Sequence, residues 1–329
     1  MSASRVAAID IGSNSIKILV AARSPDGGLL TVHSRAIDAR ISAGISRQRP
    51  LLGEEGMARG VEAIRSLLAD ADRFAVSPRV LVATSAVRDA INGAEFCRRV
   101  QETTGHAIRI LSGEEEANLI GRGLTCDPAL HHRRDFYLFD LGGGSLECLT
   151  FRDRQVSQAL SLPLGCVRLT EKFVADSSQP FPQSSADALA TYVREQLRGA
   201  GISFSLSVPA VAVGTGGTLT SARAVIGARD GRSLEETLPQ VSLPALRVLL
   251  AWLGALPLAA RREVKGLPPA RADVFPAALA TLIAVAEAGQ EVALAHHQHA
   301  FAHAEQRADV DVLAGLRHHP FVGGHHQHD

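Results

Sequence analysis

The nine residues Phe139-Asp140-Leu141-Gly142-Gly143-Gly144-Ser145-Leu146-Glu147 decide how this chain folds. An apolar run of strand length precedes them (136–139) and another follows (148–151), so the three glycines predict a tight turn between two strands. A glycine turn lacks Cβ atoms, and its backbone N–H groups can therefore approach a ligand closely. An acid precedes the turn, and a hydroxyl and a second acid follow it.

This mixture of donors and carboxylates predicts a site for phosphate and a metal ion. Backbone N–H groups suit phosphate, whereas Asp140 and Glu147 would repel it unless a divalent cation lay between them. The alternative is a plain glycine turn with two adjacent acids, and a single copy of the pattern leaves that alternative open.

A second copy favours the functional interpretation. The segment Ile9-Asp10-Ile11-Gly12-Ser13-Asn14-Ser15 has the same order, apolar-Asp-apolar-Gly-x-x-Ser, 130 positions earlier, and a strand-like run again follows it. Two such units, each with an acid at its start, predict two related lobes with a site between them. Neither copy leads into a helix and the sequence contains no GxxxxGK[ST], so neither is a Walker loop or a dinucleotide-binding fingerprint.

The composition is that of a globular protein with about two domains. The 329 residues are 46% hydrophobic and 21% charged, with a net charge of zero, which argues against nucleic acid as a partner. The four cysteines have no CxxC spacing, so we expect neither a zinc site nor disulfides, and a cytoplasmic location fits. The apolar stretches are too short for a membrane span, and the first strand begins too early for a signal peptide.

Two further segments join the end of a strand to the start of a helix. A strand over 80–83 ends in Thr84-Ser85, with Arg88 about one turn on, and a strand over 208–213 ends in Gly214-Thr215-Gly216-Gly217-Thr218. Free N–H groups at a helix start bind anions, so both segments can hold phosphate. A simple N-cap in the first segment and a ligand-free glycine loop in the second are the alternatives.

The segment Ser112-Gly113-Glu114-Glu115-Glu116 opens another helix. Ser112 and Glu115 form a capping box, and acids in a first turn suit the helix dipole, so capping accounts for much of this acidic run. The helix also begins where the chain leaves the first lobe, and a carboxylate there would face the cleft as a general base for water. Periodicity predicts the remaining helices over 54–71, 94–103, 186–198, 219–225, 243–256 and 271–288, and strands over 29–34 and 108–111.

Together these segments resemble the exopolyphosphatase / guanosine pentaphosphate phosphohydrolase (Ppx/GppA) family. The resemblance covers residues 6 to 289 in family order, and no single motif carries it. The matching segments are AIDIGSNSIKILVA (8–21), ATSAVRDAING (83–93), ILSGEEEANLIGRG (110–123), FDLGGGSLE (139–147), SLPLGCVRLTEKF (161–173), AVGTGGTLTSA (212–222) and KGLPPARADVFPAAL (265–279).

The resemblance implies an α/β fold of the two-lobed actin/Hsp70/sugar-kinase (ribonuclease H-like) type with a central cleft. It implies a first lobe over 1–117, a second lobe over 118–290 and a divergent His-rich tail over 291–329. It further implies Mg²⁺- or Mn²⁺-dependent release of terminal orthophosphate from inorganic polyphosphate or from the 5′ end of pppGpp. A homodimer is compatible with the family, and neither a membrane nor a nucleic acid is expected as a partner.

Matched residue by residue, the resemblance also implies the roles of the site residues. Glu116 falls on the catalytic glutamate, which would activate water, and Arg88 would assist at the phosphate. Asp10, Asp140 and Glu147 fall on the acids of the metal site. The positions that face phosphate are Asn14, Ser15, Thr84, Ser85, Gly143, Gly144, Ser145, Gly216, Gly217 and Thr218.

Two other functions stay open on this sequence. One is an ATP-dependent kinase of the same superfold, which shares the phosphate turns, and the other is a weakly catalytic regulator that binds alarmone or polyphosphate. The chain departs from the family near its end, where His, Gln, Ala and Asp predominate from His296 onward instead of an apolar strand that returns to the first lobe. Such a segment buries little surface, so we expect residues 296–329 to add little to folding and not to line the cleft.

Overall fold

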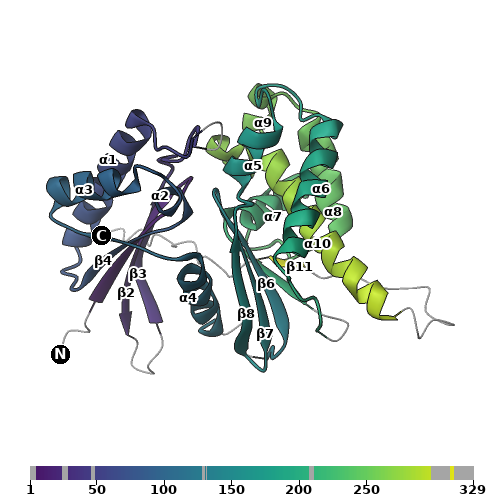
Figure 1. Ribbon diagram of the computed structural model, residues 1–329, viewed down its shortest axis with the longest axis horizontal. Helices are drawn as coiled ribbons and strands as arrows, with labels where there is room; N and C mark the ends of the chain where they lie inside the picture. The colour runs from purple at the N-terminus through teal and green to yellow at the C-terminus, as the bar shows by residue number, and fades with distance from the viewer. Residues whose placement is uncertain are drawn as a thin grey trace, which may run out of the picture.

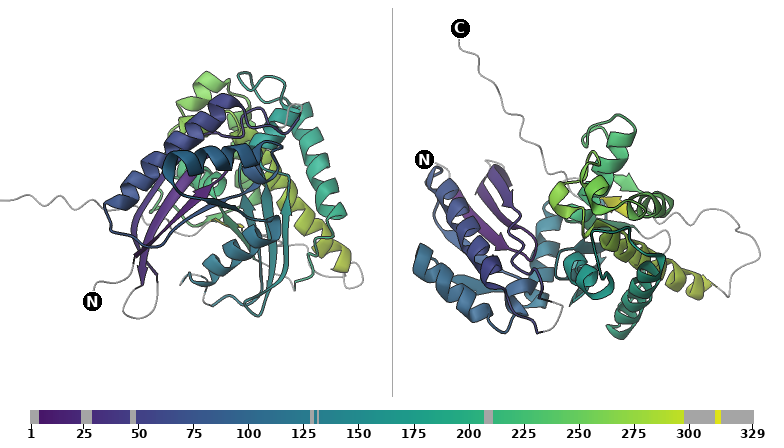
Figure 2. Two further views of the ribbon diagram at one scale, coloured as in Figure 1. Left: turned by 60° about the vertical axis from the view of Figure 1, so that its left-hand side comes forward. Right: turned by 90° about the horizontal axis from the view of Figure 1, so that it is seen from above.

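The computed structural model of the chain has two lobes that lie side by side, each built on one β-sheet (Figure 1). A view from above shows the same separation into two bodies (Figure 2, right). The structure describes residues 5–23, 29–45, 49–127, 130, 132–206, 211–297 and 312–314.

The first sheet has the strand order β3-β2-β1-β4-β5. β1 and β2 form the hairpin predicted around Asp10, and β4 and β5 continue the sheet in parallel on the other side of β1. Parallel neighbours need crossover connections, which α1 and α3 provide. The elements are β1 (Arg5–Ile11), β2 (Ile16–Arg23), β3 (Leu29–Ile37), α1 (Glu54–Asp72), β4 (Arg79–Ala83), α2 (Ser85–Arg88), α3 (Gly93–Thr104) and β5 (Ile108–Ile110).

The second sheet repeats this arrangement, with the order β8-β7-β6-β9-β11-β10. β6, β7 and β8 form an antiparallel meander, and β9 and β11 follow in parallel, as β4 and β5 do in the first lobe. The duplication predicted from the two Asp–Gly turns therefore extends over whole sheets, and the predicted two-lobed, actin-like α/β fold is confirmed. The strands are β6 (Phe136–Leu141), β7 (Leu146–Arg152), β8 (Gln155–Leu162), β9 (Ala212–Thr215), β10 (Gln240–Val241) and β11 (Val312–Ala314).

The strand at the fifth position of this sheet comes from the His-rich tail. Leu313 of β11 pairs with Val213 of β9 on one side and with Gln240 of β10 on the other. The expectation that residues 296–329 add little to folding did not foresee this strand, because three residues are too few for a periodic signal. α10 also runs on to His297, past the predicted boundary at residue 290, and the rest of the tail lies outside the described residues.

Helix α4 (Gly113–Thr125) passes from the first lobe to the second, and Figure 1 shows it between the two sheets. The N–H of Leu111, just before the helix, bonds the carbonyl of Ala83 in the first lobe at 2.9 Å. Farther along, Ala117 and Leu124 are buried against strands of the second sheet. The predicted lobe boundary at residues 117–118 therefore falls inside a helix that packs mainly on the second lobe.

The remaining helices belong to the second lobe and surround its largest core. This core joins β6 and β7 to the helices, with Leu189, Leu246 and Leu279 fully buried. The sequence did not predict β8 or α5. The helices are α5 (Cys166–Phe173), α6 (Gln183–Gly199), α7 (Gly217–Arg229), α8 (Leu243–Gly254), α9 (Leu258–Arg262), the 3₁₀ turn η2 (Pro269–Arg271) and α10 (Phe275–His297).

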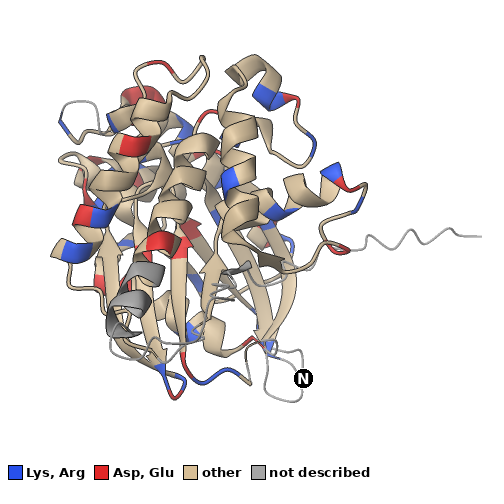
Figure 3. Ribbon diagram, turned by 90° about the vertical axis from the view of Figure 1, so that its right-hand side faces the viewer, with Lys and Arg blue, Asp and Glu red and all other residues tan. Residues whose placement is uncertain are grey.

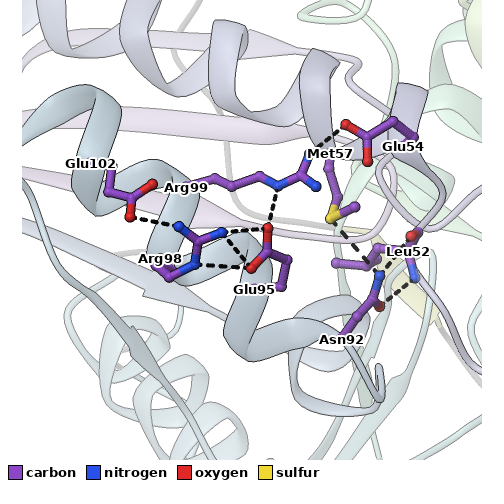
Figure 4. Close-up of polar contacts among 8 residues, drawn as sticks. All are labelled: Leu52, Glu54, Met57, Asn92, Glu95, Arg98, Arg99 and Glu102. Carbon is purple, nitrogen blue, oxygen red and sulfur yellow. Dashed lines mark hydrogen bonds and ion pairs between the residues drawn. The ribbon is translucent and has the colours of Figure 1, made fainter.

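A polar network fixes the connection between α2 and α3 in the first lobe (Figure 4). The side-chain oxygen of Asn92 accepts from the N–H of Leu52 at 2.8 Å, and its amide donates to the Leu52 carbonyl at 2.9 Å. Glu95 accepts from both Arg98 and Arg99 on the same helix. The loop that follows Arg88 is therefore tied to the body of the lobe at Asn92.

Charges of both signs are interspersed on the outer face of the second lobe (Figure 3). This agrees with the net charge of zero. Within the described part of the chain, no helix combines the length and apolar character needed to cross a membrane.

Candidate functional site

The two Asp–Gly turns have the same backbone closure. The N–H of Gly12 bonds the carbonyl of Ser15 at 3.2 Å, and the N–H of Gly142 bonds that of Ser145 at 3.0 Å. Across each hairpin the acid faces the residue seven positions on, which is Lys17 for Asp10 and Glu147 for Asp140. The duplicated turns thus place a cation in one lobe and an anion in the other at equivalent positions.

These turns contact each other across the lobes. A Cβ atom on Gly144 would lie 2.2 Å from the Ser85 hydroxyl and 2.3 Å from that of Ser13, and one on Gly143 would lie 3.1 Å from the Ser13 Cβ. The two serine hydroxyls are themselves 3.1 Å apart, within hydrogen-bond distance. Glycine is therefore needed at 144 because the opposite lobe occupies the space of a side chain.

Strands β4 and β9 bring the other two predicted segments to the same place. Asp10 is level with Val82 of β4, and Asp140 is level with Thr215 of β9. Each of these strands leads within two residues into a helix, α2 or α7, so Thr84-Ser85 and Gly216-Gly217 are structural equivalents. Gly216 has a φ of +87°, which favours glycine.

The four segments enclose a cleft of about 340 Å³ between the lobes. Thirteen of the fifteen predicted site residues line it: Asp10, Asn14, Ser15, Thr84, Ser85, Glu116, Asp140, Gly143, Gly144, Ser145, Glu147, Gly216 and Gly217. The other two do not. Arg88 reaches the site through Glu116, and Thr218 is buried behind Gly217 in the first turn of α7.

Burial and mutual repulsion perturb the carboxylates of this cleft. Burial raises the pKa of Asp10 and that of Asp140, and Lys17 opposes both shifts. For Glu147, burial and the neighbouring charges of Glu116 and Asp140 raise the pKa to about 8, although Ser161 donates to its carboxylate at 2.8 Å. Such a group is largely protonated at neutral pH unless a cation compensates its charge.

Glu116 lies in the first turn of α4, next to the predicted capping box. That box is present, since the Ser112 hydroxyl accepts from the N–H of Glu115 at 3.1 Å and the Glu115 carboxylate accepts from the N–H of Ser112 at 2.9 Å. Glu115 is thus a cap, whereas the Glu116 carboxylate turns into the cleft and accepts from Arg88 Nη1 at 2.8 Å. Burial raises the pKa of Glu116, and Arg88 limits this rise.

The residues of the cleft fit a hard divalent cation that shares its ligands with a phosphate. The side-chain oxygen of Asn14 is buried without a hydrogen-bond partner, while its amide points to Asp38 at 3.3 Å. Amide and carboxylate oxygens are typical Mg²⁺ ligands. Among the described residues, no three His, Cys, Asp or Glu side chains are grouped closely enough to hold a metal alone. A metal held here would therefore also need ligands from the substrate phosphate.

The structure adds cleft residues that the sequence reasoning missed, chiefly Lys17, Arg271 and Cys166. A Cβ atom on Gly217 would lie 2.1 Å from Arg271 Nη1, so this guanidinium lies directly over the start of α7. Cys166 is buried, and burial raises the pKa of its thiol to about 11. Lys17 could have been found from the register of the first hairpin, because it is seven residues after Asp10 as Glu147 is after Asp140.

Ion pairs also hold the lobes together. Arg40 of the first lobe makes two contacts of 2.6 Å with Asp273 of the second, and Arg168 of α5 donates to Asp89 at 2.6 Å. A second cavity of about 390 Å³ lies beside the Arg40–Asp273 pair and shares Ser13 with the wall of the cleft.

Comparison with known proteins places this site in a family. A family model for the Ppx/GppA phosphatase family matches residues 20–300. Among solved structures, an exopolyphosphatase-like protein has a TM-score of 0.80 at 25% identity over 94% of each chain. An exopolyphosphatase from Cytophaga hutchinsonii has a TM-score of 0.77 at 22% identity, covering 87% of this chain and 91% of that one. A Ppx/GppA protein from Aquifex aeolicus has 0.69 at 23% identity, covering 87% and 91%. The chain described here belongs to the Ppx/GppA phosphatase family.

Proposed function

We propose that this chain releases terminal orthophosphate from inorganic polyphosphate, from the 5′ end of pppGpp, or from both. The observation that carries the proposal is the position of Glu116, a partly buried carboxylate in a cleft walled by two glycine turns and two helix starts. The family membership and the named exopolyphosphatases among the similar structures support this class of substrate.

The step is hydrolysis of a phosphoanhydride bond. Water attacks the terminal phosphorus, Glu116 accepts a proton from that water, and the bond to the bridging oxygen breaks, so that the shortened chain leaves with the electron pair. Arg88 would hold the Glu116 carboxylate in place through the 2.8 Å contact. Burial raises the pKa of Glu116, and a higher pKa makes a carboxylate a stronger proton acceptor.

Charge on the phosphate oxygens must be balanced for this step. Gly143 and Gly144 would bring backbone close to these oxygens, and Lys17 and Arg271 would add positive charge from either lobe. Asp140, Glu147 and Asp10 would hold Mg²⁺ or Mn²⁺, which when bound neutralises phosphate charge.

The test is phosphate release by the purified full chain from polyphosphate and from pppGpp, each with Mg²⁺ and with chelator. We expect orthophosphate from at least one substrate, only with the metal and without any acceptor. A requirement for an acceptor would favour the kinase alternative. Tight binding of either compound without turnover would favour the regulator.

A further inference from the structure

A continuous chain of contacts links the candidate base to the second lobe. Arg88 Nη1 donates to Glu116 at 2.8 Å, and Arg88 Nε lies 3.4 Å from Asp89 Oδ1. The other oxygen of Asp89 accepts from Arg168 Nη2 at 2.6 Å, and Arg168 Nε donates to the Gly144 carbonyl at 3.0 Å. Both ends of this chain, Glu116 and Gly144, line the cleft.

This series of side-chain contacts passes between the two lobes twice. Arg88 and Asp89 belong to the first lobe, at the end of α2, whereas Arg168 lies on α5 of the second lobe and Glu116 on α4, which packs on the second sheet. Each of the two neighbouring first-lobe charges is therefore paired with a second-lobe side chain of opposite sign. Arg88 is paired with Glu116, and Asp89 is paired with Arg168. Any movement that separates the lobes would disturb both ion pairs together.

Burial makes these contacts stronger than ordinary surface pairs. The side chains of Arg88, Arg168 and Asp89 are 22%, 20% and 32% exposed, and that of Glu116 is 12% exposed. Partial burial lowers the screening by water, and the opposite charges attract more strongly as a result. Asn92 adds rigidity behind them, since its two hydrogen bonds to Leu52 fix the segment that follows Asp89 (Figure 4).

We propose that Asp89 and Arg168 are positioning residues that couple the approach of the two lobes to the orientation of Arg88 on Glu116. Asp89 holds the Nε side of the Arg88 guanidinium, which leaves Nη1 directed at Glu116. Arg168 can hold Asp89 only while the second lobe lies against the first. In that arrangement Arg168 also donates to the Gly144 carbonyl. The inference rests on the proposed function, because Glu116 is the group that is oriented.

The alternative is that the Asp89–Arg168 pair only strengthens the interface, as the Arg40–Asp273 pair does. The chain offers a matched control in that second pair, which also joins the lobes at 2.6 Å but has no described contact with Glu116 or Arg88. Comparing Arg168→Met with Arg40→Met therefore separates positioning from attachment.

The experiment measures kcat, KM and Tm of the full chain on the better of the two substrates. Arg168→Met and Asp89→Asn should each lower kcat about 10- to 100-fold, as expected when a catalytic group is misplaced. The double variant should be no worse than the poorer single one, since both residues act through one path. Arg168→Lys, which keeps the charge, should recover part of kcat. Arg40→Met should change KM or Tm and leave kcat nearly unchanged.

A further cycle connects these variants to the base. In a Glu116→Gln background, Arg168→Met should lower kcat no further. If Arg168→Met and Arg40→Met affect kcat alike, or if Arg168→Met keeps its full effect without Glu116, the inference is overturned while the proposed function stands. If the wild type turns over neither substrate, the proposed function fails. The inference is then tested by the Tm values of the single and double variants. Non-additive Tm changes for Glu116→Gln and Arg168→Met support the linked chain, and additive changes overturn it.

Discussion

Replacing Glu116 by glutamine tests the proposed base most directly. The substitution keeps the size of the side chain but removes the proton acceptor, so we expect turnover to fall about 10²–10⁴-fold. At 1.36 kcal/mol for each factor of ten, this range corresponds to about 2.7–5.4 kcal/mol of barrier. KM should change little, because Glu116 would contact the water and not the phosphate chain.

The structure also predicts that this variant stays folded. Arg88 would lose the charge of Glu116 but keep Asp89 beside its Nε and the Leu111 carbonyl at 3.2 Å from its Nη1. Burial already disfavours the charged form of Glu116 and raises its pKa, so a neutral amide removes a desolvation penalty along with the ion pair. The two effects oppose each other, and Tm should therefore stay close to that of the wild type.

Glu115→Gln is the matched control, with the same chemical change one residue away. Glu115 caps α4 and pairs with Arg109 on the surface, and glutamine can also complete a capping box. Phosphate release should stay within about twofold of the wild type, a difference of less than ~0.5 kcal/mol in barrier. Near-normal turnover of Glu116→Gln, or an equal loss in both variants, would refute the assignment of the base.

Three further predictions follow from the carboxylates and the tail. Asp140→Asn should raise the Mg²⁺ concentration needed for half-maximal phosphate release, and an unchanged Mg²⁺ titration would contradict the proposed metal site. The folded-state pKa of Glu147 is raised to about 8 from an ordinary value of 4.5, so its contribution to stability is lost as pH rises through that window. Between pH 5 and pH 8, the Tm of the chelator-treated wild type should thus fall by more than the Tm of the Glu147→Gln variant. Equal falls in Tm for the two proteins would contradict this prediction. A chain ending at Ala295 lacks β11 and should melt at a lower temperature than the full chain; equal melting and full turnover would support the original expectation for the tail.

Local chemistry explains why the sequence predicted the turns and caps correctly. The Asp10 and Asp140 hairpins and the Ser112 capping box each depend on residues within a few positions, so their patterns are visible without a structure. The duplicated pattern then implied two lobes and a cleft between them. Most of the predicted phosphate and metal residues line that cleft for this reason.

The parts that were missed depend on residues far apart in the chain. Arg168 meets Asp89 across 79 positions, and Arg40 meets Asp273 across 233. Neither pair leaves a periodic signal, because an arginine on a helix or loop is usually a solvated surface residue. Arg271 likewise reaches Gly217 only through the packing of the second lobe. β11 was missed because three paired residues in a His-rich segment resemble no strand by composition.

The contact of Gly144 with Ser13 and Ser85 also fixes how far the lobes can approach. On one side there is backbone alone, and on the other are two short serine side chains whose hydroxyls already lie within bonding distance of each other. The two lobes therefore meet at this point through backbone and two short side chains, with no layer of long side chains between them. The width of the cleft beside this contact therefore depends on the absence of a Cβ atom at residue 144.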